Sequence, residues 1–313
     1  MTIKGYSFLE LIPVPIAGLM LALATTGNTI KPRSEILRYI FGLVAMAIFL
    51  LLLSKTIRYF EYTKDDFYNV VIASVMPTFS MGGMVISTYI LPINYAFASI
   101  LWYLCVALHI FFICAFTIMH LVKYKKGSII PSWYIVYVGI VVATVTGKAF
   151  NPFIGKLSFY FGFISYLVLI PFVVKKVYVD KDMKEPIKPL KAIMAAPGSL
   201  CLAGYISGIK DKNSAMIMLL VALSQIFYVV VLAELPRILK IKFYPSLSAI
   251  TFPLAISGLS MRMYNKYLVT IGNPSSIINV VSTVEEAISV VICLYVLYKY
   301  TVFLKVKFNE SRL

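Results

Sequence analysis

Five helix-breaking residues fall at nearly even intervals of about 60 residues along this chain, each inside an apolar segment. A proline removes a backbone N–H donor and clashes with the preceding turn, so it bends or breaks a helix. At such a break, amide hydrogens that begin the next half-helix carry positive potential and favour anions without any fixed cation. The pattern predicts weak anion-binding chemistry at five repeated breaks, which are Pro15, Pro77, Gly139, Pro197 and Pro253.

The repetition indicates a unit in which alternate helices bend at a similar depth, and such helices arranged around an axis can leave a central pore. The fifth apolar segment departs from the pattern, because its proline, Pro131, lies at its start. A proline is harmless in a first helical turn, so Gly139 must provide the flexible point. Glycine in membrane helices also permits close packing. Both the pore-lining and the packing interpretation of Gly139 stay open.

Polar groups near the breaks are candidates to supplement the anion site. A helical serine or threonine also bonds the carbonyl one turn earlier, and for each hydroxyl taken singly we favour that role. Lys148 either raises the anion concentration at a pore mouth or is an interfacial lysine with its stem on apolar surface. The candidates are Thr26, Thr78, Thr144, Ser199, Thr251 and Lys148.

Acidic residues inside the apolar segments are few. Glu285 and Glu286 lie in the tenth segment, and Glu234 ends the eighth. An intramembrane carboxylate is a functional candidate by default, and a proton-coupled carrier would need one in its pathway. We expect these residues to pair instead with a basic residue such as Arg237 or Arg262.

The motifs of covalent and metal chemistry are missing from the sequence. It contains no His-Glu-x-x-His, no CxxC and no glycine-rich phosphate loop, and the acidic pair Asp65-Asp66 stands alone. The four cysteines lie in apolar runs, where we expect buried free thiols. We predict no enzymatic activity, no metal, no cofactor and no disulfide.

The composition excludes a water-soluble globule. The chain has 313 residues, of which 60% are hydrophobic and 13% charged, against about 25% charged in soluble domains. Its net charge is +16. The basic residues lie in short loops between apolar runs, where they act as topology signals facing anionic lipids rather than as a nucleic-acid surface. We predict one polytopic membrane domain over residues 1–313, in contact with the lipid bilayer and not with nucleic acid.

The fold class predicted is an all-α integral membrane protein with ten transmembrane helices. The segments pair into five hairpins, in which the odd members hold the breaks and the even members are plainer. Irregular backbone is tolerated in a membrane where it is buried in protein or lines a cavity, so we expect bent inner and straight outer helices. The predicted spans are 8–30, 36–54, 70–91, 95–119, 132–150, 157–174, 191–209, 214–234, 245–261 and 277–300.

The distribution of basic residues predicts the orientation. Ten spans place both termini on one side, and that side holds 20 lysines and arginines against 9 on the other. Basic loops stay in the cytoplasm. Both termini are therefore expected to be cytoplasmic, in a multi-pass protein of the cell membrane.

Five stretches, which begin the five hairpins, give the chain a family resemblance. With these stretches in this order, the chain resembles the tellurite-resistance/dicarboxylate-transporter family. That family includes bacterial tellurite-resistance proteins, fungal malate and sulfite transporters, and plant guard-cell slow anion channels. The stretches are Ile12–Asn28 (IPVPIAGLMLALATTGN), Pro77–Leu91 (PTFSMGGMVISTYIL), Pro131–Thr146 (PSWYIVYVGIVVATVT), Ala196–Tyr205 (APGSLCLAGY) and Tyr244–Ser257 (YPSLSAITFPLAIS).

The resemblance implies five helical hairpins in a quasi-fivefold ring, with a central pore lined by the odd helices. It also implies a homotrimer with one pore in each subunit, and small anions such as chloride, nitrate, sulfite or dicarboxylates as substrates. In channel members a phenylalanine on the ninth span blocks the pore, and the matching residue here is Phe252. A bulky ring beside the Pro253 bend fits a steric and dewetting gate.

We therefore predict an anion channel or transporter gated by Phe252. The alternative within transport is a proton-coupled C4-dicarboxylate carrier of the malate type, or a carrier related to sulfite or tellurite. A membrane-embedded enzyme and a receptor-like sensor are the alternatives from other classes, and neither has a supporting motif.

Overall fold

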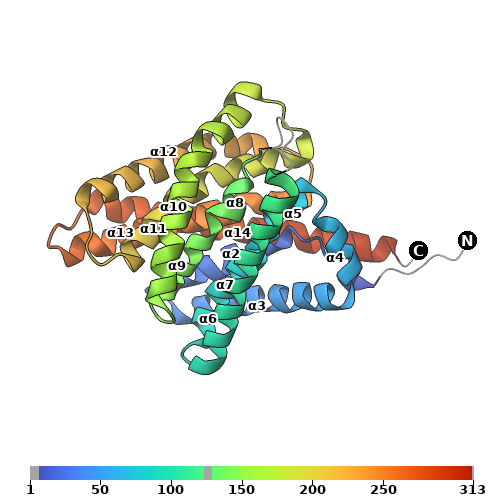
Figure 1. The fold of residues 1–313 in the computed structure, drawn as a ribbon, viewed down its shortest axis with the longest axis horizontal. Coiled ribbons are helices and arrows are strands. Elements are labelled where there is room, and N and C mark those ends of the chain that lie inside the picture. Colours follow the sequence, from blue (N-terminus) through green and yellow to red (C-terminus); the bar gives the residue numbers. More distant parts are fainter. Residues whose placement is uncertain (1–6, 123–128, 312–313) are drawn as a thin grey trace, which may run out of the picture.

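The computed structural model describes residues 7–122 and 129–311, and within these ranges it contains helices and no strands (Figure 1). Five of the helices are long and continuous. Each begins after a serine or asparagine whose side chain accepts a backbone N–H of the first turn, which is the usual helix N-cap. The five are α3 (Glu35–Arg58), α7 (Tyr95–Phe116), α10 (Pro152–Val174), α12 (Ser214–Leu239) and α14 (Ser276–Glu310).

Each continuous helix is preceded in the chain by a broken segment, and each of these five segments is divided into two or three helical pieces. Pro77 opens α6, and Pro197 is the second residue of α11, where a missing N–H costs no hydrogen bond. The pieces are α1 (Phe8–Leu11) and α2 (Ile16–Ile30); α5 (Val70–Val75) and α6 (Pro77–Ile90); α8 (Trp133–Tyr137), η2 (Gly139–Val141) and α9 (Val142–Gly147); η4 (Glu185–Ala195) and α11 (Ala196–Gly208); and η5 (Pro245–Ile250) and α13 (Thr251–Thr270).

Three short pieces complete the described chain, namely α4 (Phe60–Asp66), η1 (Thr117–Leu121) and η3 (Lys175–Asp180). Pieces η1 and η3 directly follow α7 and α10, and α4 follows α3 after one intervening residue. They lie at the ends of the long helices and leave the centre of the molecule to the broken segments.

Contacts between the helices follow two rules. Each broken segment packs on the continuous helix that follows it, so that α2 contacts α3, α6 contacts α7, α9 contacts α10, α11 contacts α12 and α13 contacts α14. The broken segments also contact one another in the order α2, α6, α9, α11, α13 and back to α2. The first and last hairpins are thereby neighbours, and the five broken segments form a closed circuit of contacts.

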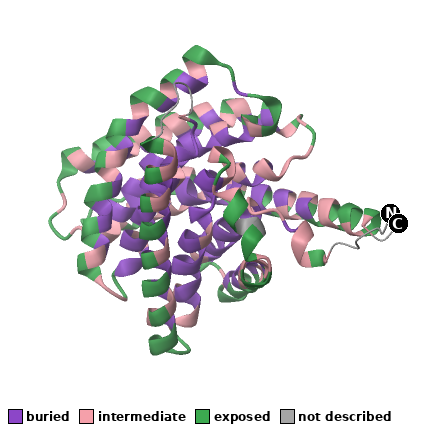
Figure 2. Cartoon of the chain, turned by 45° about the vertical axis from the view of Figure 1, so that its right-hand side comes forward, coloured by how far each residue is buried: buried purple, intermediate pink, exposed green. Residues whose placement is uncertain are grey.

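Burial separates the two kinds of segment (Figure 2). In the most apolar windows of Val70–Ile90 and Glu185–Gly208, 78% and 83% of the residues are buried, against 28–39% in the five continuous helices. The continuous helices instead expose large apolar side chains, such as Leu43, Leu104 and Val291. An apolar exterior around a buried centre is the pattern of a protein whose solvent is lipid.

Seven helices of the described chain are long and apolar enough to cross a membrane: the five continuous ones, Val70–Ile90 and Glu185–Gly208. The other three apolar segments differ in form, because α2 has 15 residues, the fifth segment is in three pieces, and α13 carries Arg262 and Lys266 in its second half. The all-α membrane class is thus supported, whereas ten spans in a quasi-fivefold ring stay a prediction.

The two described ends of the chain lie at the same end of the molecule (Figure 1). The rings of Phe8 in α1 and Phe308 in α14 pack edge to face, with their centroids 5.9 Å apart. This contact adds to the closure between the first and last hairpins.

Candidate functional site

Two cavities lie among the broken segments. The first, which we call the apolar cavity, encloses about 60 Å³ and is lined by residues from all five broken segments. None of the described residues in its lining is charged. Its lining includes Val71, Thr78, Tyr134, Ile193 and Ala249.

The second cavity, which we call the basic cavity, encloses about 340 Å³ and is lined by residues of the same five segments and by Arg38 of α3. Among the described residues of its lining, the charged ones are Lys31 and Arg38. The remaining lining includes Asn28, Thr88 and Met263. The two cavities therefore differ in both size and charge.

Two residues, Phe252 and Leu200, belong to the linings of both cavities. Phe252 is the second residue of α13, directly after the change from η5, and its side chain is 7% exposed. Leu200 lies on the neighbouring α11 and is 2% exposed. Both are well packed, and they stand between the two cavities. Sequence reasoning missed Leu200, because a leucine in an apolar helix carries no distinguishing signal.

Four of the five predicted breaks line the apolar cavity: Pro15, Gly139, Pro197 and Pro253. Pro77 is absent from the described lining, although its neighbours Val75 and Thr78 are present. At Gly139 the helix changes to η2, and a Cβ there would lie 2.7 Å from Met81 Sδ. Gly139 thus lines this cavity and also permits close packing, whereas the pore-lining interpretation stays a prediction.

Only some of the predicted polar candidates line a cavity. Thr78 lines the apolar cavity, and its hydroxyl donates to the Val75 carbonyl at 2.6 Å. Thr26 instead faces α14, with its Oγ1 3.5 Å from both Ser289 Oγ and Cys293 Sγ. Thr144 Oγ1 donates to the Gly155 carbonyl of α10 at 2.7 Å. Thr26 and Thr144 belong to neither described lining.

Ser199 and Thr251 likewise belong to neither described lining, and their hydroxyls bond other protein groups. Ser199 Oγ lies 2.8 Å from the hydroxyls of Ser224 and Ser257, which joins α11 to α12 and α13. Thr251 Oγ1 donates to the Ser248 carbonyl at 2.6 Å. These hydroxyls hold the broken segments to their neighbours.

Lys148 is exposed and belongs to neither described lining. The cations that line the basic cavity, Lys31 and Arg38, were counted from the sequence as topology signals alone. In the sequence, a basic residue close to the end of an apolar span looks like a topology signal. One signal distinguishes Arg38: it lies in the first turn of α3, four residues after the capping Ser34.

Arg38 is 4% exposed and is held on several sides. Its Nε donates to Asn28 Oδ1 at 3.1 Å, and its Nη2 donates to the Thr88 carbonyl at 3.2 Å. The guanidinium also stacks over the ring of Tyr89, 4.6 Å from its centroid. Such a set of contacts fixes the orientation of the planar group.

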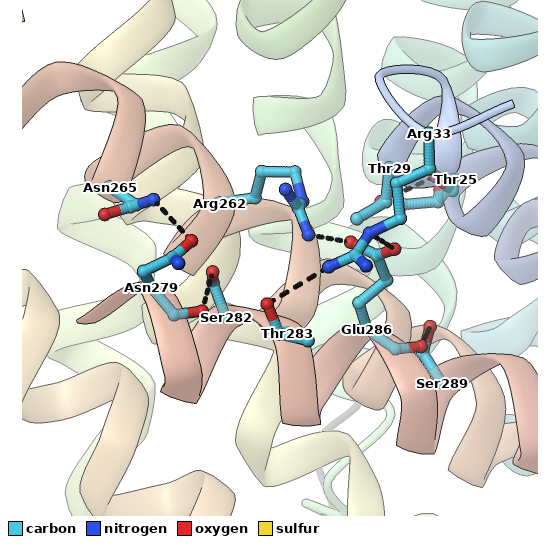
Figure 3. A network of polar contacts seen from close by, with 10 residues as sticks. All are labelled: Thr25, Thr29, Arg33, Arg262, Asn265, Asn279, Ser282, Thr283, Glu286 and Ser289. Atoms are coloured by element: carbon cyan, nitrogen blue, oxygen red, sulfur yellow. Dashed lines mark hydrogen bonds and ion pairs between the residues drawn. The ribbon is translucent and has the colours of Figure 1, made fainter. Parts of the chain in front are cut away.

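A second polar cluster joins the turn after α2 to α13 and α14 (Figure 3). In this Glu286 cluster, the carboxylate of Glu286 accepts Arg33 Nε at 2.8 Å and also bonds Arg262 Nη2. Arg33 Nη2 donates to Thr283 Oγ1 at 3.1 Å. Glu286 is 5% exposed, so both arginines compensate a buried charge. The expected pairing of Glu286 with Arg262 is confirmed.

The other two acidic residues of the apolar segments, Glu234 and Glu285, differ from each other in whether they form an ion pair. Glu234 pairs with Arg237 at 2.7 Å and with Lys191 at 3.6 Å, as expected. Glu285 is 2% exposed, and neither carboxylate oxygen has a hydrogen-bond partner in the described structure. The expectation of pairing with a basic residue is therefore wrong for Glu285, because Arg33 and Arg262 pair with Glu286 instead. Glu285 belongs to neither cavity lining.

Among the cysteines, Cys105, Cys201 and Cys293 are buried free thiols, and Cys114 is exposed on α7. The expectation that all four are buried was wrong for Cys114. A cysteine in an apolar run packs equally well on a lipid-facing surface.

Comparisons with known proteins agree with this architecture. A comparison with curated protein sequences gave no match. The model of the family described as voltage-dependent anion channel matches residues 12–301, which is most of the chain. The five stretches that carry the resemblance all lie within that range. The chain therefore belongs to the voltage-dependent anion channel family, which confirms the resemblance to the tellurite-resistance proteins and plant slow anion channels.

Proposed function

We propose that this protein is an anion channel whose pathway runs through the apolar and basic cavities and is closed at Phe252. One observation carries the proposal: Phe252, together with Leu200, lines both cavities and stands between them. A packed phenylalanine ring between two cavities blocks an ion sterically and excludes water from the constriction. Opening requires that the ring move aside or that the helices around it separate.

The apolar cavity supports an anionic substrate through its backbone. The helices α2, α6, α11 and α13 begin at or beside residues of its lining, such as Pro15, Thr78, Pro197 and Phe252. Helix N-termini carry positive potential from their unbonded N–H groups. An anion is thereby favoured over a cation without a fixed charge, and weak binding of this kind permits rapid passage.

The proposed arrangement in the membrane follows the hairpin order. One domain over residues 1–313 would cross the cell membrane ten times, with its five broken segments in a quasi-fivefold ring and both termini in the cytoplasm. The closed circuit of contacts among the broken segments supports the ring. The excess of basic residues on the side of the termini supports the orientation. The family resemblance supports a homotrimer with one pathway in each subunit.

A proton-coupled dicarboxylate carrier has less support. Such a carrier requires a titratable group in its pathway. Among the described residues that line the two cavities there is no aspartate, glutamate or histidine. The unpaired carboxyl of Glu285 lies on the continuous helix α14, outside both linings.

The test is anion current across a voltage-clamped bilayer that contains the purified native protein or Phe252→Ala. We expect a closed native protein and a mutant current at least about tenfold larger, reversing near the equilibrium potential of chloride or nitrate. Phe41→Ala is the matched control, because Phe41 has the same 7% exposure and lines neither cavity. A folded, inserted Phe252→Ala protein that passes no more current than Phe41→Ala would refute the proposal.

A further inference from the structure

The cations of the basic cavity are incompletely compensated. Lys31 Nζ lies 3.8 Å from Glu35 Oε1, and Arg38 Nη1 lies 3.6 Å from Glu35 Oε2. One carboxylate therefore serves two cations, and its side chain is 56% exposed. In the described structure, Arg38 has no other carboxylate within ion-pair distance. A buried charge is costly unless it is paired, so a counter-ion inside the cavity would complete this site.

The guanidinium of Arg38 is preorganised to donate hydrogen bonds. Asn28 Oδ1 and the Thr88 carbonyl occupy two of its five N–H groups. Asn28 is itself oriented, because its Nδ2 donates to Thr88 Oγ1 at 3.0 Å. Nη1 faces the Glu35 carboxylate at 3.6 Å, which is beyond hydrogen-bond distance, so the other three N–H groups make no hydrogen bond within the described residues. A fixed group with free donors loses little conformational entropy when it binds a ligand.

The cavity has room for a ligand on this side of Phe252. Its volume of about 340 Å³ corresponds to roughly ten waters at about 30 Å³ each, which accommodates a small anion with part of its hydration. We expect that binding there does not require the Phe252 ring to move, because this volume is present while Phe252 and Leu200 are packed.

The chemistry of Arg38 selects a class of ligand. A guanidinium is a planar fork that donates two parallel hydrogen bonds to an oxyanion such as nitrate or a carboxylate. Chloride also accepts N–H hydrogen bonds, but as a single sphere it cannot offer two oxygens to the parallel N–H groups of the fork. An ammonium in the same place would attract both anions as a point charge.

We infer that the basic cavity is a binding site for a planar oxyanion, held by Arg38 with Lys31 as the second cation. Its role in conduction rests on the proposed function: it concentrates the anion next to the closed gate. Binding itself is independent of the gate and is measured on the closed, native protein. Nitrate and an organic carboxylate share this chemistry, and separate titrations distinguish them.

The first experiment measures anion binding by the thermal unfolding of the full chain in detergent. Nitrate, acetate and chloride are titrated separately at constant ionic strength, with a bulky sulfonate as the balancing anion. For native protein we expect saturable stabilisation by nitrate or acetate at lower concentration than by chloride. In Arg38→Lys, which keeps the charge, we expect oxyanion binding about tenfold weaker, and little change for chloride. Comparing nitrate with acetate on native protein shows whether the site prefers nitrate or an organic carboxylate.

A second pair of variants guards against misfolding of Arg38→Lys. Lys31→Gln removes an exposed cation of the basic cavity, and Lys148→Gln removes an exposed lysine that lines neither cavity. We expect oxyanion binding to weaken about threefold in Lys31→Gln and to stay at the native value in Lys148→Gln. Equal binding in all these proteins, or equal preference for nitrate, acetate and chloride in native protein, would overturn the inference.

Currents in the Phe252→Ala background separate the two proposals. If Phe252→Ala conducts, adding Arg38→Lys is expected to raise the half-saturating nitrate concentration on the side of the basic cavity about tenfold. An unchanged half-saturation would reject the site and leave the channel intact. If Phe252→Ala does not conduct, the channel proposal fails, and the titrations of native protein still decide whether the site exists.

Discussion

The apolar and basic cavities meet at Phe252 and Leu200, yet they handle charge differently. The apolar cavity has no charged residue in its described lining and relies on the ends of broken helices. The basic cavity adds Lys31 and Arg38 to the same five segments. On the proposed anion pathway we expect this difference to divide the roles: fixed charge would collect anions in the wide cavity, and weak backbone fields would let them pass through the narrow one.

The strongest test of this division places a carboxylate in each cavity of the Phe252→Ala protein, which we expect to conduct. Ala249→Asp adds an uncompensated charge to the apolar cavity. At about 5 Å and an effective dielectric constant of about 20 it would repel an anion by about 3 kcal/mol, and anion current should fall roughly 100-fold.

The matched variant is Val145→Asp, in the cavity that Lys31 and Arg38 also line, and we expect these cations to compensate the new charge. Its current should fall by less than about tenfold. Ala249→Asn controls for size. Equal losses in the two aspartate variants, measured as bilayer conductance, would remove the electrostatic difference between the cavities.

A large effect on stability is expected on the side of the basic cavity. Glu286→Gln leaves Arg33 and Arg262 without their shared carboxylate, and Glu286 is 5% exposed. We expect a loss of about 3 kcal/mol in unfolding free energy, measured by thermal or denaturant unfolding in detergent. Glu310→Gln is the control, because its pair with Lys307 is exposed and should contribute under about 1 kcal/mol. Similar unfolding of both variants would show that the Glu286 cluster does not stabilise the fold.

The boundary between the cavities gives a smaller effect. Leu200→Ala removes the second residue common to both linings but leaves the Phe252 ring. We expect a leak of about one-tenth of the Phe252→Ala current, since the aromatic ring still obstructs the path. A current as large as that of Phe252→Ala would make Leu200 an equal part of the closure.

The smallest effect concerns screening. In the Phe252→Ala background, Lys31→Gln should lower conductance at low ionic strength by about twofold and have almost no effect near 1 M salt, where the Debye length is about 3 Å. Arg38→Lys should be less sensitive to salt, because Arg38 is 4% exposed. The measurement is conductance against ionic strength, and a Lys31 effect that persists at high salt would contradict a role as an exposed charge.

The positions where helices change could be predicted from the sequence because they depend on local chemistry. Proline lacks an N–H wherever it stands, and accordingly α6 opens at Pro77 and α11 has Pro197 in its first turn. The continuous helices could be predicted for a similar reason, as long apolar runs without breaks. The family resemblance added the position of Phe252.

The direction of each side chain could not be predicted. Helix α2 is buried on nearly all sides, so its apolar pattern does not distinguish Thr25, which lines the basic cavity, from Thr26, which faces α14. The cavity-lining positions of Lys31 and Arg38 could not be predicted for another reason. Basic residues near span ends serve topology in any membrane protein, and only the packing of α2, α3 and α6 shows that these two face a cavity.

The contact between α2 and α13 has a consequence for biogenesis. About 235 residues separate the starts of these helices at Ile16 and Thr251, and at about 5–20 residues per second a ribosome needs roughly 10–50 s to synthesise that length. During this time α2, which is buried in the finished fold, has α3 as a neighbour but lacks α13. We expect a chain that stops before α13 to leave the α13-facing side of α2 uncovered.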